Sequence, residues 1–85
     1  MTAAEEVKRI YDLAKGVLDE REPVYQDSWK KFGLDTCFEN IPRKAEYLKV
    51  QKRNGKMDSP KFGEDLLDLM NWCAFTYMHW EGGRK

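Results

Sequence analysis

Several residue types are scarce in this sequence, and each shortage excludes a class of protein. Two cysteines in 85 residues are too few for a disulfide scaffold and suit a reducing compartment. No apolar run approaches the ~18–20 residues of a membrane span, and the polar, acidic first six residues do not resemble a signal peptide. There is no glycine-rich phosphate loop, no Cys-x-x-Cys pair and no Ser-His-Asp set, so covalent nucleophilic catalysis has no support.

What the sequence does contain is the composition of a soluble globular protein, with 41% hydrophobic, 35% charged and 13% aromatic residues. A chain of 85 residues is too short for two ordinary domains. We therefore expect a single domain over residues 1–81 and a flexible tail over residues 82–85. The core of so small a domain is marginal and tends to need a partner subunit.

Charge is balanced overall but unevenly distributed along the chain. Fifteen basic residues offset fifteen acidic ones, which argues against a general nucleic-acid binder. Residues 43–61, however, hold seven basic residues and only two acidic ones. Two interpretations stay open: this block attracts phosphates, or it is the solvated face of a helix and its turn.

The first expected helix begins at a capping box and ends before a proline. Thr2 is expected to accept a hydrogen bond from the Glu5 amide, and apolar spacings of 3 and 4 extend the helix to about Asp19. Pro23 disfavours any continuation, so residues 20–36 are expected to form a connecting segment. The stripe consists of Val7, Ile10, Ala14 and Val17.

A second helix is expected to begin near Asp35 or Thr36, with a kink or restart at Pro42. It should end at Asn54 and Gly55, because glycine adopts the left-handed conformation without a steric penalty. Its apolar side consists of Phe38, Ile41, Ala45 and Leu48.

The third expected helix runs from about Pro60 to Trp80, with Asp58 or Ser59 as its cap. From Leu66 onward it is apolar nearly all round, and such a helix is buried on more than one side. Three helices in 85 residues cannot surround it, so we predict an all-α three-helix bundle completed by homo-oligomerisation, as a dimer or higher. The residues expected to face inward are Phe62, Leu66, Leu69, Met70, Cys73, Tyr77 and Trp80.

Polar residues stand out within this apolar helix. Glu64, Asp68 and Asn71 share one face by their spacing, and Asp65 flanks them. Burying unpaired carboxylates is costly, so they lie at a wet rim or meet something cationic, such as basic side chains or a divalent metal. Glu64, Asp65 and Asp68 are hard oxygen ligands that suit Mg²⁺, with Mn²⁺ as a substitute. For Glu64 and Asp65, a favourable interaction with the helix dipole is an equal alternative.

The second helix offers a complementary charge. Lys44 shares a face with Asn40, Tyr47 and Gln51 and could act as a point cation toward a phosphate, or be an ordinary surface lysine. His79 is the only histidine and lies almost three turns from the carboxylates, so we expect a structural role.

Three segments together resemble a known family. They are Tyr25-x-x-Ser28-Trp29, Arg43-Lys44-x-x-Tyr47-Leu48, and Glu64-Asp65-Leu66-Leu67-Asp68-Leu69-x-Asn71-Trp72. In this order they resemble the nucleotide modification associated domain 1 family. That family is phage-rich and is similar to the all-α, MazG-type nucleoside triphosphate pyrophosphohydrolases. The resemblance covers about residues 24–80.

The resemblance implies an oligomeric, Mg²⁺-dependent protein of the cytoplasm, or of the host cytoplasm if a phage encodes it. Enzymes of this type cleave a nucleoside triphosphate between its α- and β-phosphates. By motif, Glu64 and Asp68 would be catalytic, with Asp65 as a further metal ligand. The nucleotide-binding residues would be Lys44, Asn71, Tyr25, Ser28, Trp29 and Arg43.

The sequence also departs from the family pattern. Val24, Gln26 and Tyr47 stand where the family has aspartate, glycine and arginine, and no E-x-x-E helix faces the acidic helix. Three functions therefore stay open. They are a pyrophosphohydrolase, a non-catalytic nucleotide-binding sponge or inhibitor of host defence signalling, and a module whose apolar third helix docks on a host protein. No membrane partner and no stable nucleic-acid complex is expected.

Overall fold

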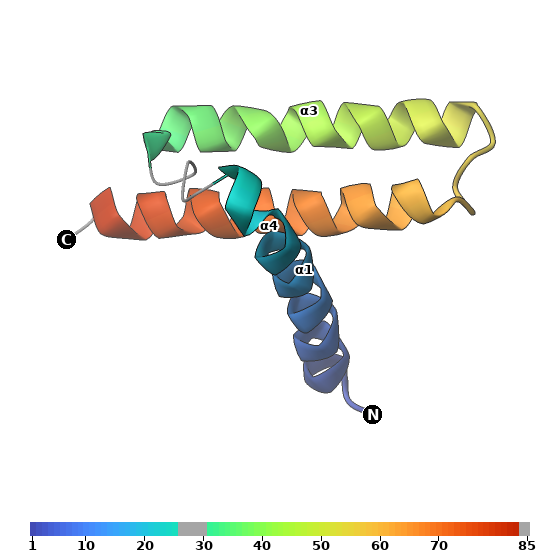
Figure 1. Ribbon diagram of the computed structural model, residues 1–85, viewed down its shortest axis with the longest axis horizontal. Coiled ribbons are helices and arrows are strands. Elements are labelled where there is room, and N and C mark those ends of the chain that lie inside the picture. The colour runs from blue at the N-terminus through green and yellow to red at the C-terminus, as the bar shows by residue number, and fades with distance from the viewer. Residues whose placement is uncertain (26–30, 84–85) are drawn as a thin grey trace.

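The described part of the chain is entirely helical. The computed structural model describes the backbone of residues 1–25 and 31–83, and the side chains of residues 1–20 and 31–83. Within that range there are three α-helices and no strand: α1 (Ala3–Tyr25), α3 (Leu34–Arg53) and α4 (Pro60–Gly83) (Figure 1). The predicted all-α class with three helices is confirmed. No helix of the described residues is long and apolar enough to cross a membrane.

Helix α1 begins as predicted but ends later. The Thr2 hydroxyl accepts a hydrogen bond from the Glu5 amide at 3.1 Å and donates one to the Glu5 carboxylate at 3.1 Å. The helix then continues through Pro23 to Tyr25, so the expected end near Asp19 is wrong. Pro23 lies in the last turn of the helix, so the hydrogen bond that its missing amide removes is at the end of the ladder and not in its interior.

Helices α3 and α4 form an antiparallel pair joined by a tight turn. Gly55 takes a left-handed φ of 70°, as predicted. The Gly55 amide donates to the Lys52 carbonyl and the Lys56 amide to the Gln51 carbonyl, which is the Schellman pattern. At the other side of the turn, the Ser59 hydroxyl accepts a hydrogen bond from the Phe62 amide at 3.4 Å.

Two details of this pair differ from expectation. Helix α3 starts at Leu34 and runs through Pro42 as one helix, so no restart occurs there. Helix α4 continues to Gly83, two residues into the segment predicted as a flexible tail. The rest of that tail, residues 84–85, lies outside the described range.

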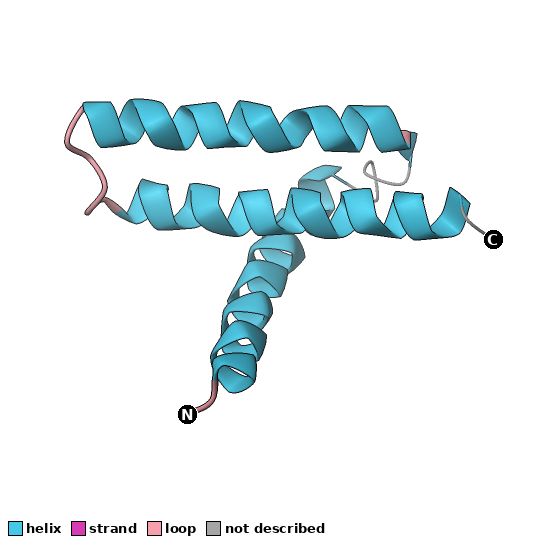
Figure 2. Cartoon of the chain, turned by 180° about the vertical axis from the view of Figure 1, so that it is seen from behind, coloured by secondary structure: helices cyan, strands magenta, loops and turns pink. Residues whose placement is uncertain are grey.

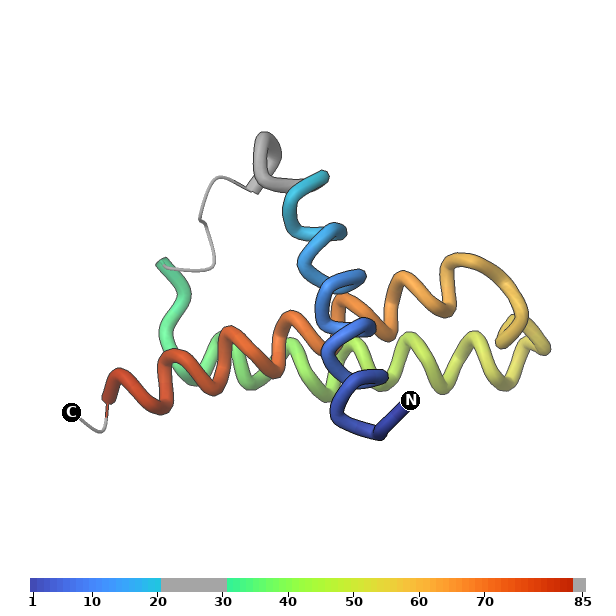
Figure 3. Tube along the Cα trace, turned by 90° about the horizontal axis from the view of Figure 1, so that it is seen from below, coloured from blue at the N-terminus to red at the C-terminus, as the bar shows by residue number. Residues whose placement is uncertain are grey.

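Helix α1 packs on α4 and crosses the pair steeply. Its N-terminal part extends away from α3 and α4 (Figure 1). Its C-terminal half passes in front of α4 in Figure 1 and behind it in Figure 2, so it covers one side of the pair. The view from below shows the same crossing (Figure 3).

The apolar core of the described chain is small. Ala14, Cys37 and Phe75 are its buried apolar residues. Trp72 extends it, because its ring lies 5.5 Å from Phe75 in an edge-to-face contact and 6.2 Å from Phe32 in a stack. Burial also raises the pKa of the Cys37 thiol, because a thiolate would lose its solvation there.

The predicted inward stripe of the third helix is wrong for a single chain. Leu66, Cys73, Tyr77 and Trp80 are exposed, and Phe75, which the spacing placed on the far side, is buried. The reason is that α1 and α3 pack against the side of α4 that carries Asp65, Asp68 and Asn71. The other members of the stripe, Phe62, Leu69 and Met70, are half-buried. Cys73 is consequently exposed, whereas its place in the stripe predicted burial.

Candidate functional site: a buried ion-pair cluster

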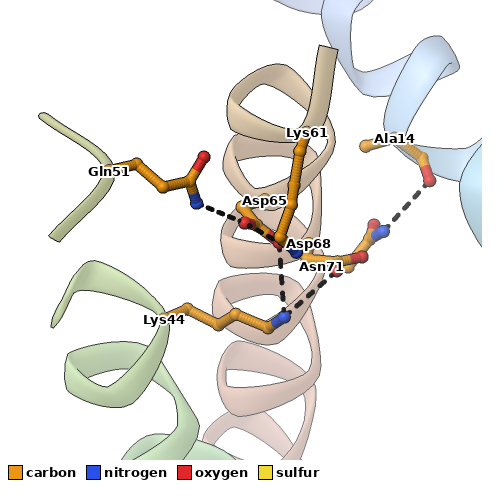
Figure 4. A network of polar contacts seen from close by, with 7 residues as sticks. All are labelled: Ala14, Lys44, Gln51, Lys61, Asp65, Asp68 and Asn71. Carbon is orange, nitrogen blue, oxygen red and sulfur yellow. Dashed lines mark hydrogen bonds and ion pairs between the residues drawn. The ribbon is translucent and has the colours of Figure 1, made fainter. Parts of the chain in front are cut away.

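A cluster of charged side chains lies between α3 and α4. Lys44 and Gln51 are seven residues apart on α3, which is about two helical turns, so they share a face. Asp65 and Asp68 are three apart on α4 and share the facing side. Because the two helices are antiparallel, Gln51 lies opposite Asp65 and Lys44 lies beside both aspartates (Figure 4). We call Lys44, Asp65 and Asp68 the ion-pair cluster.

The contacts within the cluster are short. The Lys44 Nζ lies 3.3 Å from Asp68 Oδ2 and 3.6 Å from Asp65 Oδ1. The Gln51 Nε2 donates a hydrogen bond of 2.6 Å to Asp65 Oδ2. Lys61, whose side chain is 74% exposed, reaches the same oxygen from the rim at 3.6 Å. Asp65 therefore has three polar neighbours and Asp68 has the ammonium of Lys44.

Burial makes this cluster energetically important. The side chains of Lys44, Asp65 and Asp68 are 18%, 6% and 9% exposed. Removing such groups from water costs several kcal/mol per ion, which mutual attraction repays only with good geometry. Both carboxylates lie within reach of the buried Lys44 ammonium, and the exposed Lys61 approaches Asp65 from the rim. Two buried carboxylates this close together offer hard oxygen atoms to a cation or to a hydrogen-bond donor.

Asn71 ties the cluster's helix to α1. Its Nδ2 donates a hydrogen bond of 3.0 Å to the Ala14 carbonyl, and both residues are buried (Figure 4). The small Ala14 side chain lets the α1 backbone approach α4 closely enough for this bond. Asn71 is therefore engaged in helix docking, one turn along α4 from Asp68.

Gln51 also presents an acceptor. Its Oε1 is buried and has no hydrogen-bond partner among the described residues. The orientation of the amide is set by Asp65, because a carboxylate accepts hydrogen bonds and the NH₂ end must face it. A buried amide oxygen beside two carboxylates adds a further hard oxygen ligand for a cation.

The structure separates the predicted acidic residues. Asp65 and Asp68 meet at the cluster, whereas Glu64, which the spacing grouped with Asp68, is exposed. The helix turns so that position 65 faces α3 and position 64 does not. Among the described residues, no three His, Cys, Asp or Glu side chains come together as a group that could hold a metal ion.

The remaining predicted residues lie in different places. Lys44 belongs to the cluster, and its ammonium also makes a cation–π contact with the Tyr47 ring, 5.5 Å from the ring centroid. Arg43 is exposed on α3. Tyr25 is the last residue of α1, with no side chain described, and Ser28 and Trp29 lie outside the described residues.

Gln51, Lys61 and Ala14 contribute to the site, although none of them was among the predicted site residues. Gln51 carries a signal, since it lies seven residues from Lys44 and so shares its helix face. Lys61 has a weaker one, as a basic residue four positions before Asp65. Ala14 has no such signal in the sequence, because its backbone carbonyl, and not its side chain, accepts the hydrogen bond from Asn71.

The donor chemistry of the cluster is compatible with Mg²⁺. This ion commonly takes one or two protein carboxylates and completes its shell with water and substrate phosphates. Asp65, Asp68 and the free Gln51 oxygen are ligands of that kind. The Lys44 ammonium lies between the two aspartates, so it and a metal ion would compete for the same carboxylates.

Comparison of the chain with protein-family models, curated proteins and solved structures finds no match.

Proposed function

We propose that this chain handles nucleotides through the ion-pair cluster, with a divalent cation linking the aspartates to the phosphates. The observation that carries the proposal is the burial of two carboxylates that share one ammonium. A fold gains little stability from such burial, so a charged cluster of this kind is a candidate functional site. The motif resemblance over residues 24–80 supplies the ligand class.

Each residue of the cluster has a part in this proposal. Asp65 and Asp68 would hold Mg²⁺, which when bound stabilises phosphate charge and lowers the pKa of a coordinated water. In the free chain, Lys44 forms ion pairs with both aspartates. Its long side chain can turn toward a phosphate, for which an ammonium is a point cation. The exposed Glu64 has no part, although its motif position implied one.

Binding without turnover is a second candidate, favoured by the composition of α3. The MazG-type enzymes that the sequence resembles place paired glutamates opposite the acidic helix. Here Glu46 pairs with Arg53 at 3.0 Å and Glu39 is exposed, so neither belongs to the cluster. Within the described residues, α3 brings a cation and an amide to the site in place of carboxylates.

A single assay separates these candidates. The thermal midpoint of the protein is measured with nucleoside mono-, di- and triphosphates and cyclic nucleotides, each in Mg²⁺ and in EDTA, and the products are analysed. Stabilisation in Mg²⁺ together with pyrophosphate release indicates an enzyme. Stabilisation without any product indicates a binding protein. If no nucleotide shifts the midpoint and none is cleaved, the proposed function is wrong.

Neighbouring residues provide a matched control. Asp68→Asn and Asp65→Asn should abolish the Mg²⁺-dependent shift, because each removes a carboxylate of the cluster. Glu64→Gln removes the same charge from the adjacent, exposed position and should leave the shift unchanged. Equal losses in all three variants would show that the overall charge of α4, and not the cluster, attracts the ligand.

A further inference from the structure

The α3–α4 pair has a second feature, an exposed apolar face. An open groove of about 470 Å³ runs between the two helices near the start of α3 and the end of α4. On α3 and on α4 its apolar residues recur at the spacing i, i+4, i+7, so each helix presents one stripe. We call this the apolar face, and it consists of Leu34, Phe38, Ile41, Cys73, Tyr77 and Trp80.

The apolar face lies away from α1. Asn71 bonds to α1, and Cys73 follows it by two residues, which is about 200° around the helix. Seen from behind, α4 passes in front of the C-terminal half of α1 (Figure 2). No described helix therefore covers this face, and Phe38 and Tyr77 are each 58% exposed on it.

The whole chain exposes more surface than its mass requires. A compact protein of 10.1 kDa exposes about 5,300 Å², whereas this chain exposes 6525 Å². The excess of about 1,200 Å² is larger than the roughly 800 Å² that each partner buries in a standard stable interface. The radius of gyration, 14.0 Å, likewise exceeds the about 12 Å expected of 85 residues.

We propose that the apolar face binds a second copy of this chain, so that two α3–α4 pairs form a four-helix core. In a two-fold symmetric contact the same patch serves both partners, and paired apolar stripes on antiparallel helices are the surfaces that four-helix bundles bury. The excess exposed area is large enough for an interface of standard size. The contact would also supply the larger core that a single chain lacks.

This inference does not depend on the proposed nucleotide function. The masses below are measured without nucleotide or metal, so failure of one proposal leaves the other standing. Burial of Cys73 in the contact gives a second, independent readout.

The first experiment is the solution mass of the full chain by sedimentation over a range of concentrations. We expect twice the 10.1 kDa of one chain. Phe38→Glu and Tyr77→Glu place a charge on the apolar face and should yield monomers with unchanged helical circular dichroism. Both residues are exposed in the single chain, so its fold should tolerate the change.

Two variants serve as matched controls. Met57→Glu, in the turn between α3 and α4, and Val7→Glu, on α1, alter residues that are each 52% exposed but lie outside the apolar face. Both should remain dimers. A dimer that survives Phe38→Glu and Tyr77→Glu but is lost in Val7→Glu would place the contact on α1 and overturn the proposal.

Thiol labelling tests the same contact in the unmodified protein. Cys73 should react slowly with a maleimide where the dimer predominates and faster on dilution, in proportion to the fraction of monomer. Cys37 is fully buried and should stay unreactive under both conditions, which makes it an internal reference. A wild-type chain that is monomeric at every concentration would overturn the proposal and leave the face free for a different protein.

Discussion

The two sides of the α3–α4 pair use opposite chemistry. The side toward α1 buries ions and amides, with Lys44, Asp65, Asp68 and Asn71 shielded from solvent. The apolar face leaves aromatic residues such as Phe38 and Tyr77 in water. Residue polarity alone therefore does not determine which side chains are buried in this single chain. Polar groups enter the interior where partners satisfy them, and apolar groups stay outside where no described element covers them.

Among the variants that test this contrast, Lys44→Met is expected to have the largest effect. It should lower the free energy of unfolding by about 3–5 kcal/mol, because two buried carboxylates lose their shared ammonium. The measurement is chemical denaturation followed by circular dichroism. Lys61→Met is the matched control at the exposed rim and should cost less than about 1 kcal/mol. Similar costs for both lysines would mean that the cluster is effectively solvated.

Asn71→Ala should produce the next largest effect, a loss of about 1–3 kcal/mol, because a buried hydrogen bond between helices is removed. Its specific consequence is faster hydrogen exchange in α1 than in α3 or α4, measured by mass spectrometry of peptides. Asn40→Ala is the control, since the Asn40 amide bonds to the Thr36 carbonyl within its own helix. If Asn40→Ala loosens α1 to the same degree, the Asn71 bond is not what holds it.

Tyr77→Ala tests the apolar face. In dilute, monomeric protein it should change the free energy of unfolding by less than about 1 kcal/mol, because an exposed ring loses few contacts. Phe75→Ala, two residues away but buried, should cost about 3–5 kcal/mol under the same conditions. At concentrations where the dimer forms, the cost of Tyr77→Ala should rise. A constant cost at all concentrations would contradict a contact at this face.

The smallest expected effect concerns the buried thiol. Burial raises the pKa of Cys37, so the folded chain holds this proton more tightly than the unfolded chain. The resulting stability is fully present below the ordinary thiol pKa of about 8.5 and is lost as pH rises through the folded value. Because other groups titrate there too, the measurement is the difference from Cys37→Ala. The difference in the free energy of unfolding between the two proteins should decrease as the pH rises. A difference that stays constant with pH would contradict the raised pKa of Cys37.

Local signals in the sequence predicted the secondary structure well. The capping box, the glycine turn and the Ser59 cap each depend on residues within a few positions, so the sequence contains all the information they need. The predicted end of α1 near Asp19 is wrong, because a helix can tolerate a proline in its last turn, where Pro23 lies.

The candidate site was predictable in part. The grouping of acidic residues on one helix and a lysine on another follows from spacing. Which acid faces the lysine did not follow, because spacing alone does not fix how α4 is rotated against its neighbours. The structure resolves this in favour of Asp65 over Glu64. It also adds Gln51, whose amide only matters once α3 and α4 lie antiparallel.

The helices, their caps and one apolar stripe on each of α3 and α4 follow from the sequence alone, because periodicity and capping are local properties. Which side of each helix faces inward follows from tertiary packing. The rotation of α4 is set by its contacts with α1 and α3. These contacts bury Asp65, Asp68 and Asn71 with their partners and leave the apolar face exposed.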